Sequence, residues 1–146
     1  IENALQLYYD DNGVYPPVTY DNGNLAGWEV STRGDFLESL APKYLSKVPV
    51  DPRNEDMGAI NMFFAPRPND GNFFYMYYNY GSGSWYGCPW SSAFAVVGFR
   101  AMEKTNAANL PKARCGPQNP PCPGGGIPNV CRDWSTEFDY SIILVP

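Results

Sequence analysis

The sequence IENALQLYYDDNG, residues 1–13, predicts a helix with a single apolar stripe. Side chains on one face of a helix recur at i, i+3, i+4 and i+7, and this spacing is filled by Ile1, Ala4, Leu5 and Tyr8. We expect the stripe to pack on a sheet. The helix should end near residue 12, because glycine readily adopts the left-handed conformation that follows many helices. No capping residue precedes Ile1, so we interpret 1–12 as the second half of a longer helix.

Three later stretches predict the strands of an antiparallel sheet: 72–80 (NFFYMYYNY), 93–100 (AFAVVGFR) and 138–145 (FDYSIILV). The first is aromatic throughout, which predicts that both of its faces are covered. The last alternates, with one face expected to carry Phe138, Tyr140, Ile142 and Leu144. A short helix is expected from Thr32 to the residues before Pro42, since proline disfavours helical geometry at the preceding residue. The sequence therefore predicts one α+β domain over 1–146, with a helix packed on an antiparallel sheet.

Long loops rich in proline and glycine should connect these elements, since the chain has 15 Pro and 14 Gly among 146 residues. Ten of the eighteen residues in 111–128 are Pro or Gly, so we expect neither helix nor strand there. The four cysteines are Cys88, Cys115, Cys122 and Cys131.

None of the cysteines forms a CxxC motif. Their spacing favours two disulfides, which would tie down 104–137, over a zinc site or free buried thiols. Three pairings are possible, and we favour the pairing of sequence neighbours. Two disulfides would place the chain in an oxidising compartment.

Composition excludes several classes of function. The formal net charge is −5, from 10 basic and 15 acidic residues, which argues against nucleic acid as a partner. The chain has no histidine, so catalysis through an imidazole is excluded. A glycoside hydrolase needs only two carboxylates, but no acidic pair lies in a recognisable frame. We therefore expect no enzyme. No apolar run approaches the about 20 residues that span a bilayer.

Four stretches in order resemble one protein family. They are 4–16 (ALQLYYDDNGVYP), 40–52 (LAPKYLSKVPVDP), 75–78 (YMYY) and 93–103 (AFAVVGFRAME). Together they resemble the type IV pilin-like proteins, in particular the major pseudopilins of type II secretion. The region 104–146 departs from that family. Its acidic residues Asp133, Glu137 and Asp139 do not have the spacing of the family's calcium loop.

The resemblance implies a structural subunit of an extracytoplasmic helical filament. Such subunits begin with a hydrophobic helix that a prepilin peptidase processes. This helix anchors them in the inner membrane before assembly, and it then packs in the filament core. The implied partners are identical or related subunits, and the globular part faces the periplasm or the medium. Without the hydrophobic segment, the chain 1–146 is expected to be monomeric. A pilus, a secretion pseudopilus and a DNA-uptake fibre all fit, as do major and minor subunits.

Residues 81–90 carry a different functional signal. Trp85, Tyr86 and Trp90 lie in a glycine-rich loop, and exposed Trp and Tyr stack on sugars or anchor protein contacts. A secreted glycan- or partner-binding module outside any filament is therefore the alternative function. The competing interpretation, which the usual burial of aromatic side chains favours, is that these rings fold back over the sheet. The oxygen-rich segments 21–24 and 51–56 would suit calcium; otherwise we expect no cofactor.

Overall fold

The computed structural model describes residues 1–18, 27–55, 73–83, 85–102, 110–117, 119–123 and 126–146. Its centre is an antiparallel sheet with the strand order β1-β2-β3-β6. These strands are β1 (Glu29–Val30), β2 (Tyr75–Tyr80), β3 (Phe94–Phe99) and β6 (Tyr140–Leu144). A smaller sheet pairs β4 (Arg114–Cys115) with β5 (Arg132–Asp133). Helix α1 (Glu2–Asn12) precedes these strands in the sequence. A helix together with an antiparallel sheet confirms the α+β class.

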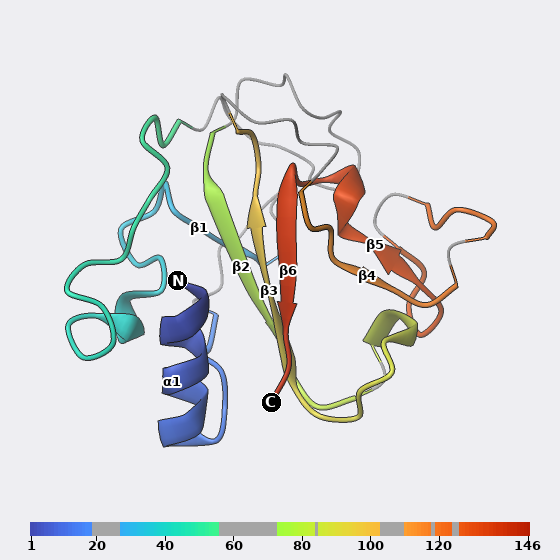
Figure 1. Ribbon diagram of the computed structural model, residues 1–146, viewed down its shortest axis with the longest axis horizontal. Coiled ribbons are helices and arrows are strands. Elements are labelled where there is room, and N and C mark those ends of the chain that lie inside the picture. Colours follow the sequence, from blue (N-terminus) through green and yellow to red (C-terminus); the bar gives the residue numbers. More distant parts are fainter. Residues whose placement is uncertain (19–26, 56–72, 84, 103–109, 118, 124–125) are drawn as a thin grey trace.

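Helix α1 lies on one side of the sheet, and β4 and β5 lie on the other (Figure 1). Its buried residues are Ala4 and Leu5, while Ile1 and Tyr8 are partly buried against the same cluster. The helix ends where expected: Gly13 has a φ of 71°, and its N–H donates to the Tyr9 carbonyl at 2.7 Å.

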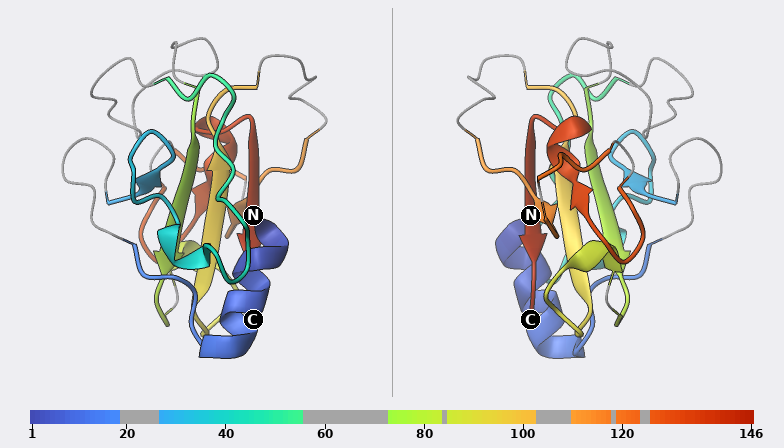
Figure 2. Two further views of the ribbon diagram at one scale, coloured as in Figure 1. Left: turned by 90° about the vertical axis from the view of Figure 1, so that its left-hand side faces the viewer. Right: turned by 90° about the vertical axis from the view of Figure 1, so that its right-hand side faces the viewer.

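The sheet buries both faces, and alternation along its strands sorts the side chains into two cores. The helix-side core contains Ala4, Leu5, Tyr15, Phe36, Leu37, Leu40, Tyr77, Ala95, Val97 and Leu144. The second core lies on the opposite face, on the side of β4 and β5, and we call it the cap-side core. It contains Trp28, Val30, Phe74, Met76, Tyr80, Cys88, Phe94, Val96, Ala113, Cys115, Trp134 and Phe138. The aromatic residues of β2 reach both cores, which is why this strand has no polar face. Figure 2 shows the two layers from the sides.

Cross-strand register keeps the two cores separate. Met76 pairs with Gly98 and Tyr80 with Phe94 on the cap side, whereas Tyr77 pairs with Val97 on the helix side. Strand β6 continues both patterns through the pairs of Val96 with Ile143 and Val97 with Ile142. Each face therefore presents a continuous apolar surface across three strands.

Three expectations from the sequence are wrong in detail. Phe138 precedes β6 and packs in the cap-side core, whereas Leu144 lies in the helix-side core; the 3-10 helix η4 (Trp134–Thr136) displaces Phe138 from the strand alternation. The segment 111–128 contains β4, because its backbone pairs with β5. Strands β4 and β5 are too short to show a hydrophobic periodicity in the sequence.

The expected helix after Thr32 is reduced to a 3-10 helix, η1 (Glu38–Leu40). Leu37 has a left-handed φ of 48°, which interrupts helical geometry. Its N–H donates to the buried Glu29 carboxylate at 3.1 Å. The tertiary contact thus replaces the helical hydrogen bonds that the sequence predicted. Within the described residues, helices are too short or too polar to span a bilayer.

Candidate functional site

The loop after β2 is held in an uncommon conformation by its glycines and one disulfide. Gly83 has a φ of 147°, and a Cβ there would lie 3.3 Å from the Trp85 indole nitrogen. Tyr86 adopts a left-handed φ of 54° inside η2 (Trp85–Gly87). The Cys88 N–H donates to the Trp85 carbonyl at 2.9 Å, and Cys88 forms a disulfide with Cys115. The loop is therefore tied to β4.

The three aromatic side chains of this loop have different placements. Tyr86 packs edge-on against Trp134, with ring centroids 6.2 Å apart, and Trp90 packs on Phe94 at 5.6 Å. Both are partly buried against the cap-side core. Trp85 remains 44% exposed. The loop thus folds back in part, and one indole stays at the surface.

Trp85 and Tyr86 border a cavity of about 130 Å³ at the end of β2. Its lining residues are Trp28, Tyr78, Asn79, Tyr80, Gly81, Trp85, Tyr86 and Arg132. Five of these eight are aromatic, so the walls consist mainly of ring faces and edges. Trp90 is outside the lining. We refer to this cavity as the aromatic pocket.

The positive charge of Arg132, which lines the aromatic pocket, is balanced by a buried carboxylate. Arg132 forms an ion pair with Glu137 at 2.9 Å, and their side chains are only 1% and 2% exposed. The guanidinium carbon lies 5.4 Å from the Tyr86 ring centroid and 5.6 Å from that of Trp134. Arg132 is thus held between two rings and a carboxylate. Burial also raises the pKa of the Tyr80 hydroxyl.

A second disulfide closes the segment behind the pocket. Cys122 pairs with Cys131, so both disulfides have the pairing favoured from the sequence. A Cβ on Gly126 would approach the Tyr86 ring to 3.1 Å. A Cβ on Gly87 would collide with the Val130 carbonyl oxygen. These close approaches pack the 122–131 loop directly on η2, which requires glycine at both points.

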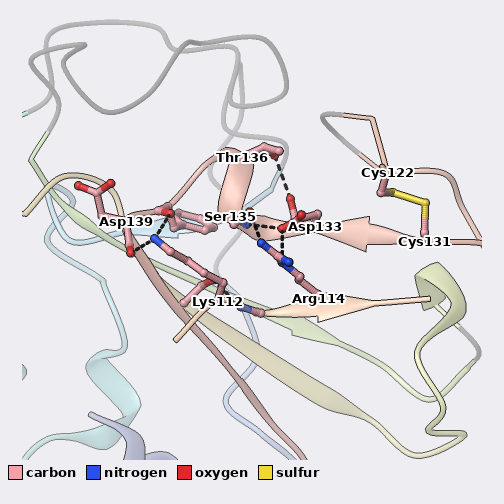
Figure 3. Close-up of polar contacts among 11 residues, drawn as sticks. Lys112, Arg114, Cys122, Cys131, Asp133, Ser135, Thr136 and Asp139 are labelled. Atoms are coloured by element: carbon pink, nitrogen blue, oxygen red, sulfur yellow. Dashed lines mark hydrogen bonds and ion pairs between the residues drawn. A yellow bond between two sulfur atoms is a disulfide. The ribbon is translucent and has the colours of Figure 1, made fainter. Parts of the chain in front are cut away.

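The C-terminal acids serve three separate contacts. Asp133 accepts a hydrogen bond from the Ser135 N–H at 2.9 Å and pairs with Arg114 at 3.2 Å (Figure 3). Asp139 accepts from the Met102 N–H at 3.1 Å, and Glu137 belongs to the buried pair with Arg132. The three carboxylates therefore have protein partners of their own.

The described residues give little support to calcium binding at the two oxygen-rich segments. Residues 21–24 and Asp56 lie outside the described residues. The Asp51 carboxylate accepts hydrogen bonds from the backbone of Arg53 at 2.9 Å and Asn54 at 3.4 Å, which is an Asx turn. Across the described part of the chain, no group of three or more His, Cys, Asp or Glu is placed to hold a metal ion.

The outer surface of α1 forms a second candidate site, for contact with another protein. Leu7 is 53% exposed, and Val14, just after the helix, is 54% exposed. Asp11 binds Lys43 at 2.7 Å and accepts from the Tyr44 hydroxyl at 3.0 Å. These hydrogen bonds, with that from Lys43 the largest influence, lower the pKa of Asp11. They offset the unfavourable position of an acid at a helix C-terminus.

Sequence reasoning identified Trp85 and Tyr86 but missed most of the pocket. Trp28, Tyr78, Tyr80 and Arg132 come from three distant segments and meet only in the folded chain. Arg132 pairs with Cys115 across β4 and β5, and the Cys88–Cys115 disulfide ties that pair to the loop. Strands β4 and β5 have only two residues each, so the sequence holds no signal that would join Arg132 to Tyr86.

Two disulfides without a free cysteine indicate an oxidising environment, extracellular or periplasmic. No protein-family model matches the chain, and no curated protein or solved structure matches it.

Proposed function

We propose that this chain is the globular part of a type IV pilin-like subunit, which builds an extracytoplasmic helical filament and has no catalytic role. The proposal begins from the four ordered stretches that resemble this family. The arrangement of α1 supports it best: the helix buries Ala4 and Leu5 in the helix-side core and leaves Leu7 exposed. Such a helix offers one face to its own domain and the other to a neighbour.

Assembly in this proposal depends on a hydrophobic helical segment ahead of Ile1. That segment would anchor the subunit in the inner membrane and later occupy the filament centre. A different surface on each neighbour would meet at every contact, because such head-to-tail contacts extend into helical filaments when they do not close into rings. The surface of α1 around Leu7 would form one side of this contact.

The disulfides are compatible with this location. Cys88–Cys115 and Cys122–Cys131 fit a subunit that matures outside the cytoplasm. The net charge of −5 argues against a filament subunit that binds DNA directly. A pilus and a secretion pseudopilus remain equal choices within the proposal.

Expression of the complete natural gene with its prepilin peptidase tests the proposal. We expect sheared surface filaments that an antibody against 1–146 labels along their length in electron microscopy. Leu7→Glu should abolish the filaments, since it places a charge in the subunit contact. The purified variant domain should keep its melting temperature, because Leu7 is 53% exposed.

Ile127→Glu is the matched control. Ile127 is 43% exposed and lies in the 122–131 loop, away from α1, so filaments should persist. The chain 1–146 alone should sediment as a monomer. A complete gene product that is secreted freely, with a cleaved signal peptide and no apolar helix, would overturn the proposal.

A further inference from the structure

We propose that the aromatic pocket binds one neutral pyranose ring, either as a free hexose or as the terminal residue of a glycan. This site is separate from the surface of α1 and does not depend on filament assembly. The pocket is about 130 Å³, well below the about 300–1,000 Å³ of pockets for drug-sized ligands. It is therefore too small for more than one ring.

The walls match the two sides of a sugar ring. A pyranose presents C–H groups on its face and hydroxyls around its edge, and aromatic side chains pack on such apolar faces. Trp85, which is 44% exposed, provides an accessible indole at the rim. Tyr78 and Tyr86 provide further, partly exposed rings.

Polar groups among the lining residues favour a sugar over an apolar side chain of a protein partner. The lining presents polar as well as apolar surface. The Asn79 amide is not part of it, because it donates to the Tyr15 and Pro16 carbonyls on the helix side, and the Arg132 nitrogens are buried. An apolar occupant would remove water from the polar surface without replacing its hydrogen bonds, which costs free energy, whereas the hydroxyls of a sugar can replace them.

Charge selects a neutral ligand. Arg132 is the only ionisable cation among the lining residues, and Glu137 balances it at 2.9 Å. The pair is almost fully buried, so an anionic sugar would meet a guanidinium that is already neutralised. A hexose without a carboxylate fits this balance.

The pocket is also preorganised. Tyr86 holds a left-handed φ of 54°, and residues in such strained conformations cluster at ligand sites. The Cys88–Cys115 disulfide fixes η2 from one side, and the 122–131 loop packs on it from the other. A rigid loop loses little conformational entropy on binding.

Titration of the chain with glucose, galactose, mannose and N-acetylglucosamine, followed by ¹H–¹⁵N NMR, tests the proposal. The chain has four tryptophans, so four indole N–H signals report on binding. At least one sugar should cause saturable shifts at Trp85 and Trp28 in the millimolar range and leave Trp90 unmoved. Methyl glycosides of that sugar distinguish the two sources: retained binding indicates a terminal glycan residue, and lost binding indicates the free hexose.

Variants sharpen the test. Trp85→Ala should weaken binding by about tenfold, whereas Trp90→Phe should leave it unchanged, because Trp90 does not line the pocket. If Trp85→Ala fails to fold, the shifts in the unmodified chain decide. The absence of saturable shifts with every sugar overturns the proposal. Saturation by N-acetyl-leucine amide but by no sugar does the same, and points to an apolar protein partner.

Discussion

Gly98 lies directly beneath the ring of Phe138: a Cβ at position 98 would come within 2.5 Å of the Phe138 Cδ1 atom. Gly98 is in the middle of β3, where glycine normally weakens a strand. Here its missing side chain makes the space that the Phe138 ring occupies. The strand and the segment after η4 are therefore matched at a single contact.

Gly98→Ala should lower the free energy of unfolding by about 1–3 kcal/mol, because a methyl group would overpack the cap-side core. Urea denaturation measures the change. Gly34→Ala is the control, since nothing lies within 4 Å of a Cβ there, and it should have little effect. In a double-mutant cycle, Phe138→Leu should relieve part of the cost of Gly98→Ala. Additive effects would contradict the contact.

Replacing one partner of the Arg132–Glu137 ion pair should lower the free energy of unfolding more than replacing both partners. Arg132→Met leaves Glu137 buried without its partner and should cost about 3–5 kcal/mol. The double change Arg132→Met with Glu137→Leu replaces both charges by apolar groups, and its cost should be much smaller. Unfolding in guanidinium chloride compares the two variants. Equal losses would show that the charges do not interact.

The two disulfides should stabilise the fold unequally. Cys88–Cys115 spans a sequence separation of 27, and Cys122–Cys131 a separation of 9. Loop entropy predicts losses of about 3–4 kcal/mol and about 2–3 kcal/mol when each pair is replaced by alanine. Thermal unfolding of the two double variants provides the comparison. A larger loss from the shorter loop would argue against the entropic account.

Alkaline pH should destabilise the domain through Tyr15, whose side chain is 1% exposed. Burial raises its pKa to about 12, against about 10 in the unfolded chain. The folded state therefore holds this proton more tightly, and its contribution to stability is complete below about pH 10 and lost as pH rises through about 12.

Unfolding free energies measured from about pH 9 to about pH 12 should fall, and Tyr15→Phe should reduce the slope. No protein group among the described residues bonds to the Tyr15 hydroxyl, so this variant should lose no stability at neutral pH. An unchanged alkaline slope in Tyr15→Phe would assign the effect to other groups.

Local patterns in the sequence predicted the elements whose signal is local. The helix over 1–12 has a clear apolar stripe and a glycine stop, and the strands β2, β3 and β6 contain runs of aromatic or β-branched residues. The α+β class follows from these. The cysteine spacing was sufficient to favour Cys88–Cys115 and Cys122–Cys131.

Features created by tertiary contact could not be predicted in this way. Strands β4 and β5 have two residues each, too few for any periodicity. Phe138 departs from its alternating pattern because η4 carries it over Gly98. The aromatic pocket depends on the pairing of β4 with β5, which places Arg132 beside Cys115, and only the folded chain specifies that pairing.

All the covalent cross-links of the domain lie on one side of the sheet. They secure the aromatic pocket and the loops around it, whereas only non-covalent packing holds α1 against the helix-side core. A pulling force transmitted along α1 would thus peel the helix from the sheet while the cross-linked half kept its shape. The side of the sheet that carries α1 would therefore unfold at a lower force than the side that carries the disulfides.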